Sequence, residues 1–464
     1  MSVDVPDLSA WRSAHLIGIG GAGMSGIARL LLARGIAVSG SDLKDSRGLA
    51  ALREAGAKVF VGHRRRQVGR PDAVVVSAAI PPGNVELKEA QRQDLPIASR
   101  AHVLAALMRS KRSVAVAGTH GKTTTTSMIS VMCSRLGLDP TFVIGGDLNE
   151  IGSGAGHGAG DVFVAEADES DGSFLLYEPA VAVVTNIEVD HLDYYPGRAE
   201  VETAFAAFAG RAGSVVACWD DSGVRRALAG TPVRLVRYGW DPAGDVVLGD
   251  EDLHWNGSTA TVRCQGESVQ LRLSVPGRHN LLNAAAALGV AAELGLPVGA
   301  AAEALGSFSG VRRRFECRGV AGGATFIDDY AHHPSEVTAT LAAARLDGSR
   351  RVVAVFQPHR YTRTHALWRE LGESLGTADV VVVTDVYGAG ERPIPGVTGK
   401  LLVQALTEAV PGKRVIYLPR RSDVVPFLAG VIRDGDLVLT MGAGDITMVA
   451  DAILEQLRTN GATP

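Results

Sequence analysis

The feature that most constrains the fold is a unit in which a short apolar segment leads into a polar turn and then into a helical pattern. Three regions of the chain contain such a segment, at residues 15–19, 113–117 and 351–356. Parallel strands need a crossover between them, and a helix is the usual crossover. Strands that alternate with helices therefore predict an α/β protein built on parallel sheets.

The length of the chain, 464 residues, exceeds what one ordinary hydrophobic core organises and predicts about three domains. We predict domains at residues 1–110, 111–312 and 313–464. The further predicted elements are strands at residues 37–39, 73–76, 162–165, 181–184, 380–383 and 437–440, a small antiparallel insert at residues 233–275, and an alanine-rich helix at residues 281–294.

The composition excludes several classes of protein. A net charge of −4 is unfavourable for binding nucleic acid or an anionic membrane surface. No apolar run reaches the roughly 18 residues of a membrane span, and residues 1–12 lack the apolar core of a signal peptide. The cysteines stand far apart without a CxxC pair, which excludes a zinc knuckle and argues against a disulfide framework. We therefore expect a cytoplasmic protein without nucleic-acid or membrane partners.

The strongest local signal is the sequence Gly-Thr-His-Gly-Lys-Thr at residues 118–123, between an apolar segment and a helical pattern. Glycines let backbone N–H groups turn toward a phosphate, and a helix N-terminus adds positive potential. Lys122 is placed to reach the β- and γ-phosphates, and Thr123 to bind magnesium. The pattern GxxxxGK[ST] needs glycine at position 116, where this chain has Val116. An ordinary strand–helix turn is the alternative, but it leaves Lys122 unexplained.

A second glycine-rich turn, at residues 18–23, fits the pattern GxGxxG after the first predicted strand. Asp42 stands 19 residues beyond Gly23, where a dinucleotide-binding fold places the acid that binds the ribose. The pattern predicts a site for a nucleotide or its diphosphate and does not say which nucleotide. A purely structural turn is the alternative.

Acidic residues follow two strands predicted in the central region. Residues 166–171 read Glu-Ala-Asp-Glu-Ser-Asp, and residues 185–191 read Thr-Asn-Ile-Glu-Val-Asp-His. The carboxyl ends of neighbouring parallel strands face one crevice, so we expect these groups beside the loop at residues 118–123. Acids and a histidine there are suited to hold magnesium against ATP oxygens. Either stretch alone is equally consistent with a polar turn, but with Lys122 they predict a metal–nucleotide site.

Three further polar stretches carry weaker signals. Residues 277–283 open the alanine-rich helix with groups able to contact a base or to cap the helix. Residues 328–334 gather aspartates and histidines in one loop. Arg360 and Arg363 follow a predicted strand and are suited to charge-assisted bonds with a carboxylate. A solvated loop is the alternative for the last two stretches.

Eight stretches, in this order, resemble the Mur ligases, the ATP-dependent amino-acid-adding enzymes of peptidoglycan precursor synthesis. They are GIGGAGMSGIA, GTHGKTTTT, EADESDGSF, TNIEVDHLDYY, GRHNLLNAAAA, GVRRRFE, DDYAHHPSEV and FQPHRYTRT. The resemblance covers nearly the whole chain and is strongest to the alanine-adding branch of the family. It implies an N-terminal Rossmann-like domain that binds UDP, a central P-loop ATPase-type α/β domain that binds ATP and magnesium, and a C-terminal Rossmann-like domain that binds the amino acid.

The resemblance also implies the reaction. L-Alanine would be joined to the lactyl carboxylate of UDP-N-acetylmuramate through an acyl phosphate, with ADP and phosphate as products. ATP and two magnesium ions would be required, and the partners would be these small molecules.

Matching the motifs residue by residue implies individual roles. The catalytic residues would be Lys122, Glu166 and His191, and the metal ligands Thr123, Glu166 and His191. The ATP-binding residues would be Gly118, Thr119, His120, Gly121, Lys122, Thr123, Thr124, His279, Asn283, Arg314 and Asp328. The UDP-sugar would contact Gly20, Gly21, Ala22, Gly23, Met24, Ser25, Asp42, Ser77, His120 and Ser170. The amino acid would contact Tyr330, His332, Arg360 and Arg363.

One departure from the wider family is informative. Several Mur ligases use a carbamylated lysine near the second magnesium, shortly after the histidine. This chain has no lysine from Thr123 to Gly399. The carbamate is therefore excluded, in agreement with the alanine-adding branch.

Three alternative functions fit part of the sequence. A recycling ligase would add an intact tripeptide to the same sugar, and the sequence does not measure the size of its acceptor pocket. An NAD(P)-dependent oxidoreductase would use residues 18–23 with Asp42, and a non-catalytic regulator would only bind a nucleotide. The oxidoreductase leaves Lys122 and the acidic strand ends unexplained, and the intact set of Lys122, Glu166 and His191 argues against a regulator without catalysis. The motifs do not distinguish L-alanine from glycine or serine as the amino acid.

Overall fold

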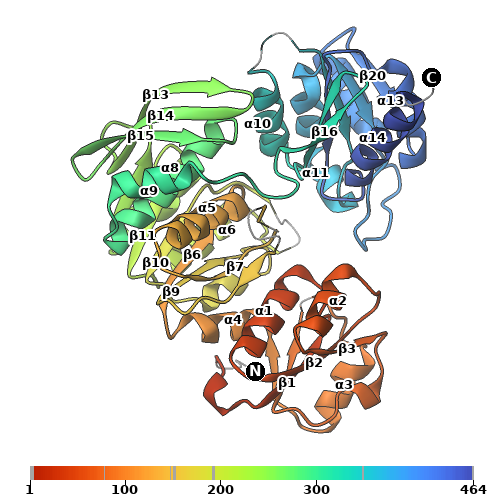
Figure 1. Ribbon diagram of the computed structural model, residues 1–464. Helices are drawn as coiled ribbons and strands as arrows, with labels where there is room; N and C mark the ends of the chain where they lie inside the picture. Colours follow the sequence, from red (N-terminus) through yellow and green to blue (C-terminus); the bar gives the residue numbers. More distant parts are fainter. Residues whose placement is uncertain are drawn as a thin grey trace. The chain divides into compact units, whose positions relative to one another are not determined.

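The computed structural model describes residues 5–77, 79–146, 148–149, 153–190, 194–346, 348 and 350–461 (Figure 1). The chain forms two compact units. The first extends from the N-terminal region to Asp250 and includes Thr261–Leu271 and Leu282–Phe308, and the second holds Glu251–Ala260, Arg272–Leu281 and the chain from Ser309 onward. The strands form sheets of five, ten and six strands.

The first sheet contains five parallel strands in the order β3-β2-β1-β4-β5. The strands are β1 (Ser13–Ile17), β2 (Ala37–Asp42), β3 (Lys58–Val61), β4 (Ala73–Val76) and β5 (Ile97–Ser99). The helices are α1 (Ala22–Ala33), α2 (Arg47–Glu54), α3 (Val85–Arg92) and α4 (Arg100–Met108). The chain runs outward from β1 to β3 and then returns to the other side of β1. In an open parallel sheet this reversal creates a crevice at the carboxyl ends of β1 and β4, where ligands bind.

Successive residues of these strands face opposite layers of helices. Leu16 and Val75 are buried in the cluster that includes side chains of α1, α2 and α4, whereas Ile17 and Val74 pack with Ala90 of α3. This alternation follows from the pleat, in which neighbouring side chains point to opposite faces. Because both faces are covered, β4 reads as a continuous apolar run, Ala-Val-Val-Val, rather than as an alternating one.

The second sheet has the strand order β15-β14-β13-β12-β11-β10-β6-β9-β7-β8. Its strands are β6 (Arg112–Ala117), β7 (Thr141–Val143), β8 (Ala155–Gly156), β9 (Val162–Glu166), β10 (Val181–Val184), β11 (Ser214–Cys218), β12 (Arg234–Gly239), β13 (Val246–His254), β14 (Gly257–Cys264) and β15 (Glu267–Leu273). The accompanying helices are α5 (Lys122–Arg135), α6 (Arg198–Ala209), α7 (Ser222–Leu228), α8 (Arg278–Leu294) and α9 (Val298–Leu305). Neighbouring strands are parallel along the series β12, β11, β10, β6, β9 and β7. The strand β8 is antiparallel to β7.

The prediction of an antiparallel insert at residues 233–275 is wrong for the first strand of that segment. The strand β12 pairs in parallel with β11, from Ser214 opposite Arg234 to Cys218 opposite Tyr238, and β13 begins in parallel with β12. The physical reason is the helix α7, which carries the chain back across the sheet between β11 and β12. A strand that follows such a crossover runs parallel to the strand before it.

The register of the central strands brings their carboxyl ends to the same level. Val116 of β6 is opposite Glu166 of β9, and Ala117 of β6 is opposite Val184 of β10. The segments that follow β6, β9 and β10 therefore leave the sheet at one edge. These are the segments that carry the glycine loop and both acidic stretches.

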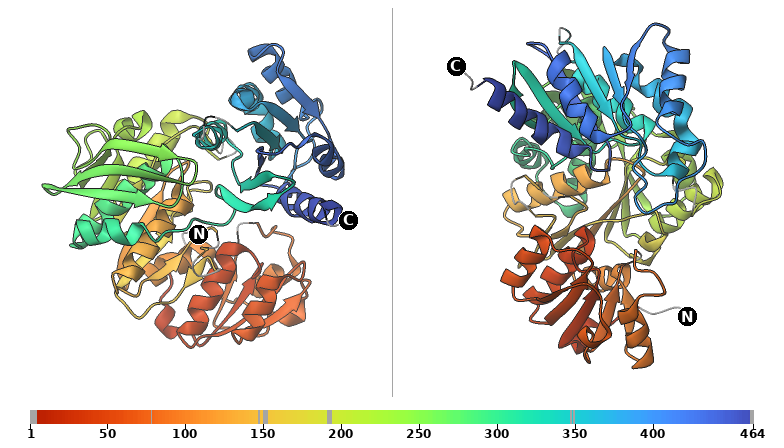
Figure 2. Two further views of the ribbon diagram at one scale, coloured as in Figure 1. Left: turned by 45° about the horizontal axis from the view of Figure 1, so that its top comes forward. Right: turned by 90° about the vertical axis from the view of Figure 1, so that its right-hand side faces the viewer.

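The third sheet has the order β16-β17-β21-β18-β19-β20, parallel except for the antiparallel pair β16 and β17. The strands are β16 (Glu316–Ala321), β17 (Ala324–Asp329), β18 (Val352–Phe356), β19 (Val380–Val383), β20 (Arg414–Tyr417) and β21 (Leu437–Met441). The helices α10 (Pro334–Ala344), α11 (Tyr361–Ser374) and α12 (Lys400–Ala409) contribute to the core on one face, and α13 (Arg421–Val431) and α14 (Thr447–Gly461) to the core on the other. Figure 2 shows α14, in dark blue, lying along this sheet.

Within the described ranges, no helix is both long and apolar enough to cross a lipid bilayer.

A buried carboxylate ties α3 to the first sheet. Glu86 is fully buried and accepts a hydrogen bond from Oγ of Ser41. Its Oε2 lies 3.5 Å from Nε2 of His15 and 3.3 Å from Nδ1 of His63, and the N–H of Arg64 donates to Oε1 at 3.0 Å. Burial opposes the charge of Glu86, but His15, Ser41 and the N–H of Arg64 outweigh burial and lower its pKa. The carboxylate therefore stays ionised in the interior.

We expect Glu86→Ala to lower the free energy of unfolding by about 3 kcal/mol, because the groups around a buried charge lose their common partner. Denaturant unfolding at neutral pH measures this loss. Since folding lowers the pKa of Glu86, its stabilisation is complete above the ordinary glutamate pKa and is lost as the pH falls through the lowered value. The difference between wild type and variant should therefore shrink in acid.

The matched control is Glu54→Ala, at an exposed position of α2. It should change the free energy of unfolding by less than about 0.5 kcal/mol. Equal losses in the two variants would show that the network around Glu86 adds nothing to stability.

Candidate functional site

The loop at residues 118–121 turns sharply between β6 and α5. Gly118 has a φ of +143° and Gly121 a φ of +79°, which residues with a Cβ rarely adopt. Gly121 is also the N-cap of α5, which begins at Lys122. The N–H groups of a first helical turn attract anions. The loop and the helix together form a site suited to phosphate groups.

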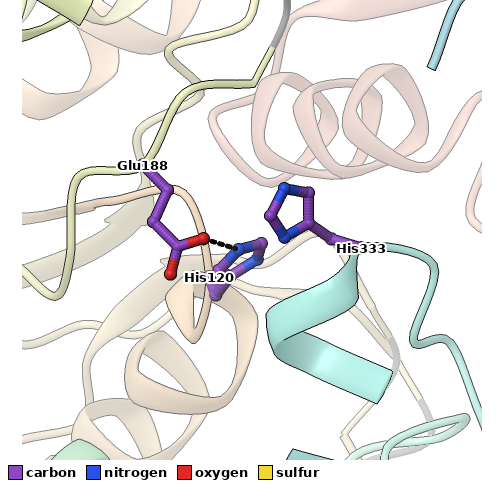
Figure 3. Close-up of side chains that lie close together, drawn as sticks. All are labelled: His120, Glu188 and His333. Atoms are coloured by element: carbon purple, nitrogen blue, oxygen red, sulfur yellow. Dashed lines mark ion pairs between the residues drawn. The ribbon is translucent and has the colours of Figure 1, made fainter. Parts of the chain in front are cut away.

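The segment that follows β10 holds this loop in place. Asn186 accepts from the N–H of His120 through Oδ1 at 2.8 Å and from the N–H of Thr119 through its carbonyl at 3.1 Å. The carbonyl of His120 accepts from Oγ1 of Thr185 at 2.6 Å and from Nδ2 of Asn186 at 3.0 Å. Nε2 of His120 lies 3.6 Å from the carboxylate of Glu188, and Figure 3 shows this ion pair. The structure thus brings the glycine loop against the tip of β10.

The ammonium of Lys122 lies in an acidic environment. Nζ is 2.8 Å from each carboxylate oxygen of Glu169 and also donates to the carbonyls of Gly118 and Thr119. The side chains of Lys122 and Glu169 are 13% and 3% exposed. Burial opposes the charged lysine, but Glu169 and Asp168 outweigh burial and raise its pKa. Lys122 is therefore a permanent cation at neutral pH.

Thr123 and Glu166 offer oxygen atoms to a metal ion. Oγ1 of Thr123 lies 3.1 and 3.2 Å from the two carboxylate oxygens of Glu166, which also accepts from the N–H of Gly145 at 2.8 Å. Hydroxyl and carboxylate oxygens are the ligands that magnesium prefers. With Asp168 and Glu169, Glu166 makes three carboxylates around one ammonium, an excess of negative charge that a divalent cation relieves. These residues fit the predicted metal site, and the predicted ligand His191 lies outside the described residues.

Asn283, which was predicted near adenine, borders the loop itself. Its Oδ1 accepts from Oγ1 of Thr125 at 3.1 Å, and a Cβ on Gly121 would lie 2.7 Å from the same oxygen. Thr124 belongs to the first turn of α5. His279, in the second compact unit, has its pKa lowered to about 4 by burial and by Arg314, so it is neutral at pH 7.

The glycine-rich turn of the first sheet is held by Asp42. The strand β1 ends at Ile17 and not at Ile19 as predicted, because Gly18 adopts a φ of +82°. Oδ2 of Asp42 accepts from the N–H of Gly20 at 2.9 Å, and a Cβ on Gly20 would lie 2.8 Å from that oxygen. In this arrangement Asp42 positions the turn.

Most of the other residues predicted for the UDP-sugar fall at the same sheet edge or close to it in sequence, whereas His120 and Ser170 lie in the segments after β6 and β9 of the second sheet. A Cβ on Gly18 would lie 3.8 Å from that of Ser77, which follows β4. The side chain of Met24 is only 2% exposed and belongs to the core, which leaves its backbone to contact a ligand. Gly21 caps α1, and the first turns of the helix contain Ala22, Gly23 and Ser25.

Arg100, which is not among the residues predicted from the sequence, lies between this turn and the acidic segment after β9. A Cβ on Gly23 would lie 2.7 Å from its Nη1. Burial opposes the charge of Asp168, but Lys122, the N–H of Ser170 and then Arg100 lower its pKa. No motif in the sequence marks Arg100, since it acts through residues far away in the chain.

In the second unit, Asp328 is part of a buried network. It is fully buried and accepts from Oγ1 of Thr440 at 2.7 Å and from Oγ1 of Thr447 at 2.6 Å, with Nε of Arg313 at 3.4 Å. Its carboxylate therefore joins β17 to β21 and α14. The neighbouring Asp329 has its pKa raised to about 6 by burial.

The predicted amino-acid residues gather around a row of rings. The ring centroids of Tyr330 and His332 are 5.4 Å apart, those of His332 and His359 5.7 Å, and those of His359 and Tyr387 5.8 Å. The guanidinium of Arg314 lies 5.2 Å from the Tyr330 ring. The pKa of His332 is lowered to about 4 and that of His359 to about 3, and burial is the largest cause of both shifts. Both rings are therefore neutral at pH 7.

The two predicted arginines have different surroundings. Nη1 of Arg363 lies 3.4 Å from Nδ1 of His359, whereas Nε of Arg360 lies 4.0 Å from the carboxylate of Glu391. Arg360 also has a φ of +68°. Neither His359 nor Glu391 is among the site residues predicted from the sequence. His359 stands inside the stretch at residues 357–363, and that position is the only signal that would have found it.

Three family models match the chain in succession: "Mur ligase family, catalytic domain" at residues 13–112, "Mur ligase middle domain" at residues 116–291, and "Mur ligase, glutamate ligase domain" at residues 313–444. A curated UDP-N-acetylmuramate–L-alanine ligase of Saccharopolyspora erythraea is 51% identical, over 97% of this chain and 94% of the relative. The chain belongs to the Mur ligase family. The UDP-N-acetylmuramate–L-alanine ligase of Pelotomaculum thermopropionicum is 48% identical, over 97% of this chain and 98% of the relative.

Solved structures of Mur ligases share the fold. The UDP-N-acetylmuramate–alanine ligase of Thermotoga maritima gives a TM-score of 0.82 at 30% identity, with 97% of this chain and 99% of that chain covered. A murein peptide ligase of Psychrobacter arcticus gives 0.71 at 26% identity, with 96% and 98% covered. The predicted three-domain α/β fold is confirmed, while the boundaries at residues 110 and 312 and the individual site roles stay predictions.

We expect Gly118→Ala to weaken the binding of ADP by about tenfold or more, because a Cβ there would overlap Oγ1 of Thr185 and displace the loop. Calorimetric titration of the purified variant measures the affinity. The backbone strain at positive φ alone costs roughly 1–2 kcal/mol. Gly35→Ala is the control for left-handed backbone strain without overlap, because Gly35 has a φ of +78° and a Cβ added there would meet no atom within 4 Å. Gly35→Ala should bind ADP normally, and normal binding by Gly118→Ala would contradict the assignment of the loop.

Proposed function

We propose that this Mur ligase joins L-alanine to the lactyl carboxylate of UDP-N-acetylmuramate and converts ATP into ADP and phosphate. The observation that carries the proposal is that the glycine loop, Lys122, Thr123 and Glu166 meet at the carboxyl ends of adjacent parallel strands. The relatives that are 51% and 48% identical to the chain are UDP-N-acetylmuramate–L-alanine ligases and are covered almost completely.

The chemistry requires an activated carboxylate. A carboxylate is a poor electrophile at neutral pH, and an amine does not displace oxide from it. The lactyl carboxylate therefore attacks the γ-phosphate, which breaks its bond to the β-phosphate and releases ADP. The amine of alanine then attacks the carbonyl carbon of the acyl phosphate, loses a proton and releases phosphate. In this scheme Lys122 offsets the negative charge that gathers during phosphoryl transfer, and the N–H groups of the loop orient the phosphates.

The proposed magnesium site uses the oxygen atoms of Thr123 and Glu166, with His191 as the proposed ligand of a second ion. When bound, magnesium neutralises charge on the phosphates and so favours attack by an anion. The carboxylates of Asp168 and Glu169 add to the attraction for a cation at this edge of the sheet. Among the described residues, Lys122 and Arg100 carry positive charges that act on these carboxylates.

The two other substrates are assigned to the first and third sheets. The glycine-rich turn at the β1–β4 crevice, positioned by Asp42, is proposed for the diphosphate of UDP-N-acetylmuramate. Arg360 and Arg363 are proposed for the carboxylate of L-alanine. The neutral rings of His332 and His359 beside Arg363 add no further positive charge, so the guanidinium itself is the anion-binding group.

The alternatives are less well supported. The recycling ligase that adds a tripeptide is favoured by the likeness to the murein peptide ligase, but that likeness is 26% identity against 51% and 48% for the alanine ligases. The oxidoreductase alternative is set aside because the chain belongs to the Mur ligases and because Asp42 is engaged by the turn. We propose a cytoplasmic location, since ATP is a cytoplasmic substrate and all four cysteines are free thiols.

The direct test is phosphate release with ATP, magnesium and UDP-N-acetylmuramate across a panel of acceptors. L-Alanine should give ADP and phosphate, and its kcat/KM should exceed that of glycine by about tenfold or more, because one methyl group contributes about 1–3 kcal/mol in an apolar pocket. L-Serine and the tripeptide complete the panel. Formation of AMP and pyrophosphate, or faster turnover with the tripeptide than with L-alanine, would overturn the proposal.

A further inference from the structure

Protein groups already occupy every hydrogen-bonding position of the Lys122 ammonium. An ammonium has three protons to donate. Four acceptors surround Nζ: the carbonyls of Gly118 and Thr119 and both carboxylate oxygens of Glu169. A phosphate oxygen that binds Lys122 must therefore replace at least one of them.

Among these four acceptors, only the oxygens of Glu169 carry a charge. The carbonyls belong to the loop, whose backbone is fixed by hydrogen bonds to Thr185 and Asn186. Glu169 instead reaches Lys122 with a side chain from the segment after β9. Glu169 and a phosphate therefore compete for the same positive charge.

Glu169 has no easy way to withdraw from this competition. Its side chain is only 3% exposed. Its carbonyl accepts from the hydroxyl of Tyr195 at 2.8 Å and from the N–H of Gly172 at 3.0 Å, which fixes the backbone at this point. The carboxylate must remain close to Lys122 when a phosphate arrives, and two anions then share one cation in a poorly solvated place. Repulsion between them weakens the phosphate contact.

We propose that Glu169 is a positioning residue that competes with the nucleotide phosphates for Lys122 and thereby speeds the release of ADP after each turnover. The proposal rests on the proposed function, since it takes the loop at residues 118–121 as the nucleotide site. It differs from a purely structural role, in which Glu169 only neutralises a buried lysine. A structural partner would support ADP binding, whereas a competitor opposes it.

The test is the affinity of Glu169→Gln for ADP in EDTA, which removes any contribution of Glu169 to metal binding. The variant keeps the shape of the side chain and removes its charge. The dissociation constant of ADP should fall by about tenfold, and the dissociation rate in stopped flow should fall by a similar factor. Weaker ADP binding by a variant with the thermal midpoint of the wild type would overturn the proposal.

Glu178→Gln is the matched control. It removes the same charge at an exposed position before β10, at the opposite end of that strand from the glycine loop. Its ADP dissociation constant should stay within about twofold of wild type, because exposed charges are screened. An equal tightening in both variants would attribute the effect to net charge and overturn the role of Glu169.

Two further variants keep the test decisive. Glu169→Asp retains the charge but shortens the side chain, so its affinity for ADP should lie between those of the wild type and Glu169→Gln. Glu169→Asp replaces Glu169→Gln in the test if Glu169→Gln does not fold. Weaker ADP binding by Glu169→Asp than by the wild type would again overturn the proposal. The double variant Lys122→Ala/Glu169→Gln leaves no unpaired charge from this pair. It should bind ADP far more weakly than Glu169→Gln alone. If the double variant binds ADP as wild type does, the loop is not the nucleotide site, and the proposed function itself fails.

Discussion

A single buried ammonium, that of Lys122, organises the central site. Its charge is opposed by burial and sustained by Glu169 and Asp168, which together raise its pKa. The same carboxylates, with Glu166, leave the surroundings negative overall. These carboxylates would repel a polyphosphate that binds alone. A polyphosphate that binds with a divalent cation matches the site, because the cation faces the carboxylates and the phosphates face the ammonium of Lys122. The chemistry proposed for this Mur ligase follows from that balance more than from any one ligand.

The balance depends on parallel strands that end at one level. The glycine loop, the acidic segment and the segment that holds the loop follow β6, β9 and β10, which are neighbours in register. The sequence could predict this part because strands buried on both faces are continuous apolar runs, and because the polar motifs stand directly after them. The predicted strands at residues 73–76, 181–184 and 380–383 coincide with β4, β10 and β19.

The sequence predicted the acidic stretch at residues 166–171 beside the glycine loop, but not which acid of that stretch pairs with Lys122. The pairing with Glu169, and the action of Arg100 of α4 on Asp168, are set by contacts between distant segments that no local periodicity marks. The direction of β12 was also mistaken, since alternation of side chains is the same in parallel and antiparallel strands and only the crossover α7 decides between them. Tertiary packing decides these pairings and the direction of β12, and it overrides the structure that a local sequence pattern predicts.

A crystal structure of the protein with magnesium and a non-hydrolysable ATP analogue tests the central claim most directly. The account predicts that Nζ of Lys122 lies at a hydrogen-bond distance of about 3 Å from oxygens of the β- or γ-phosphate, with magnesium between these oxygens and the side chains of Thr123 and Glu166. An analogue bound elsewhere, or phosphates that leave Lys122 in contact with Glu169 alone, would contradict it.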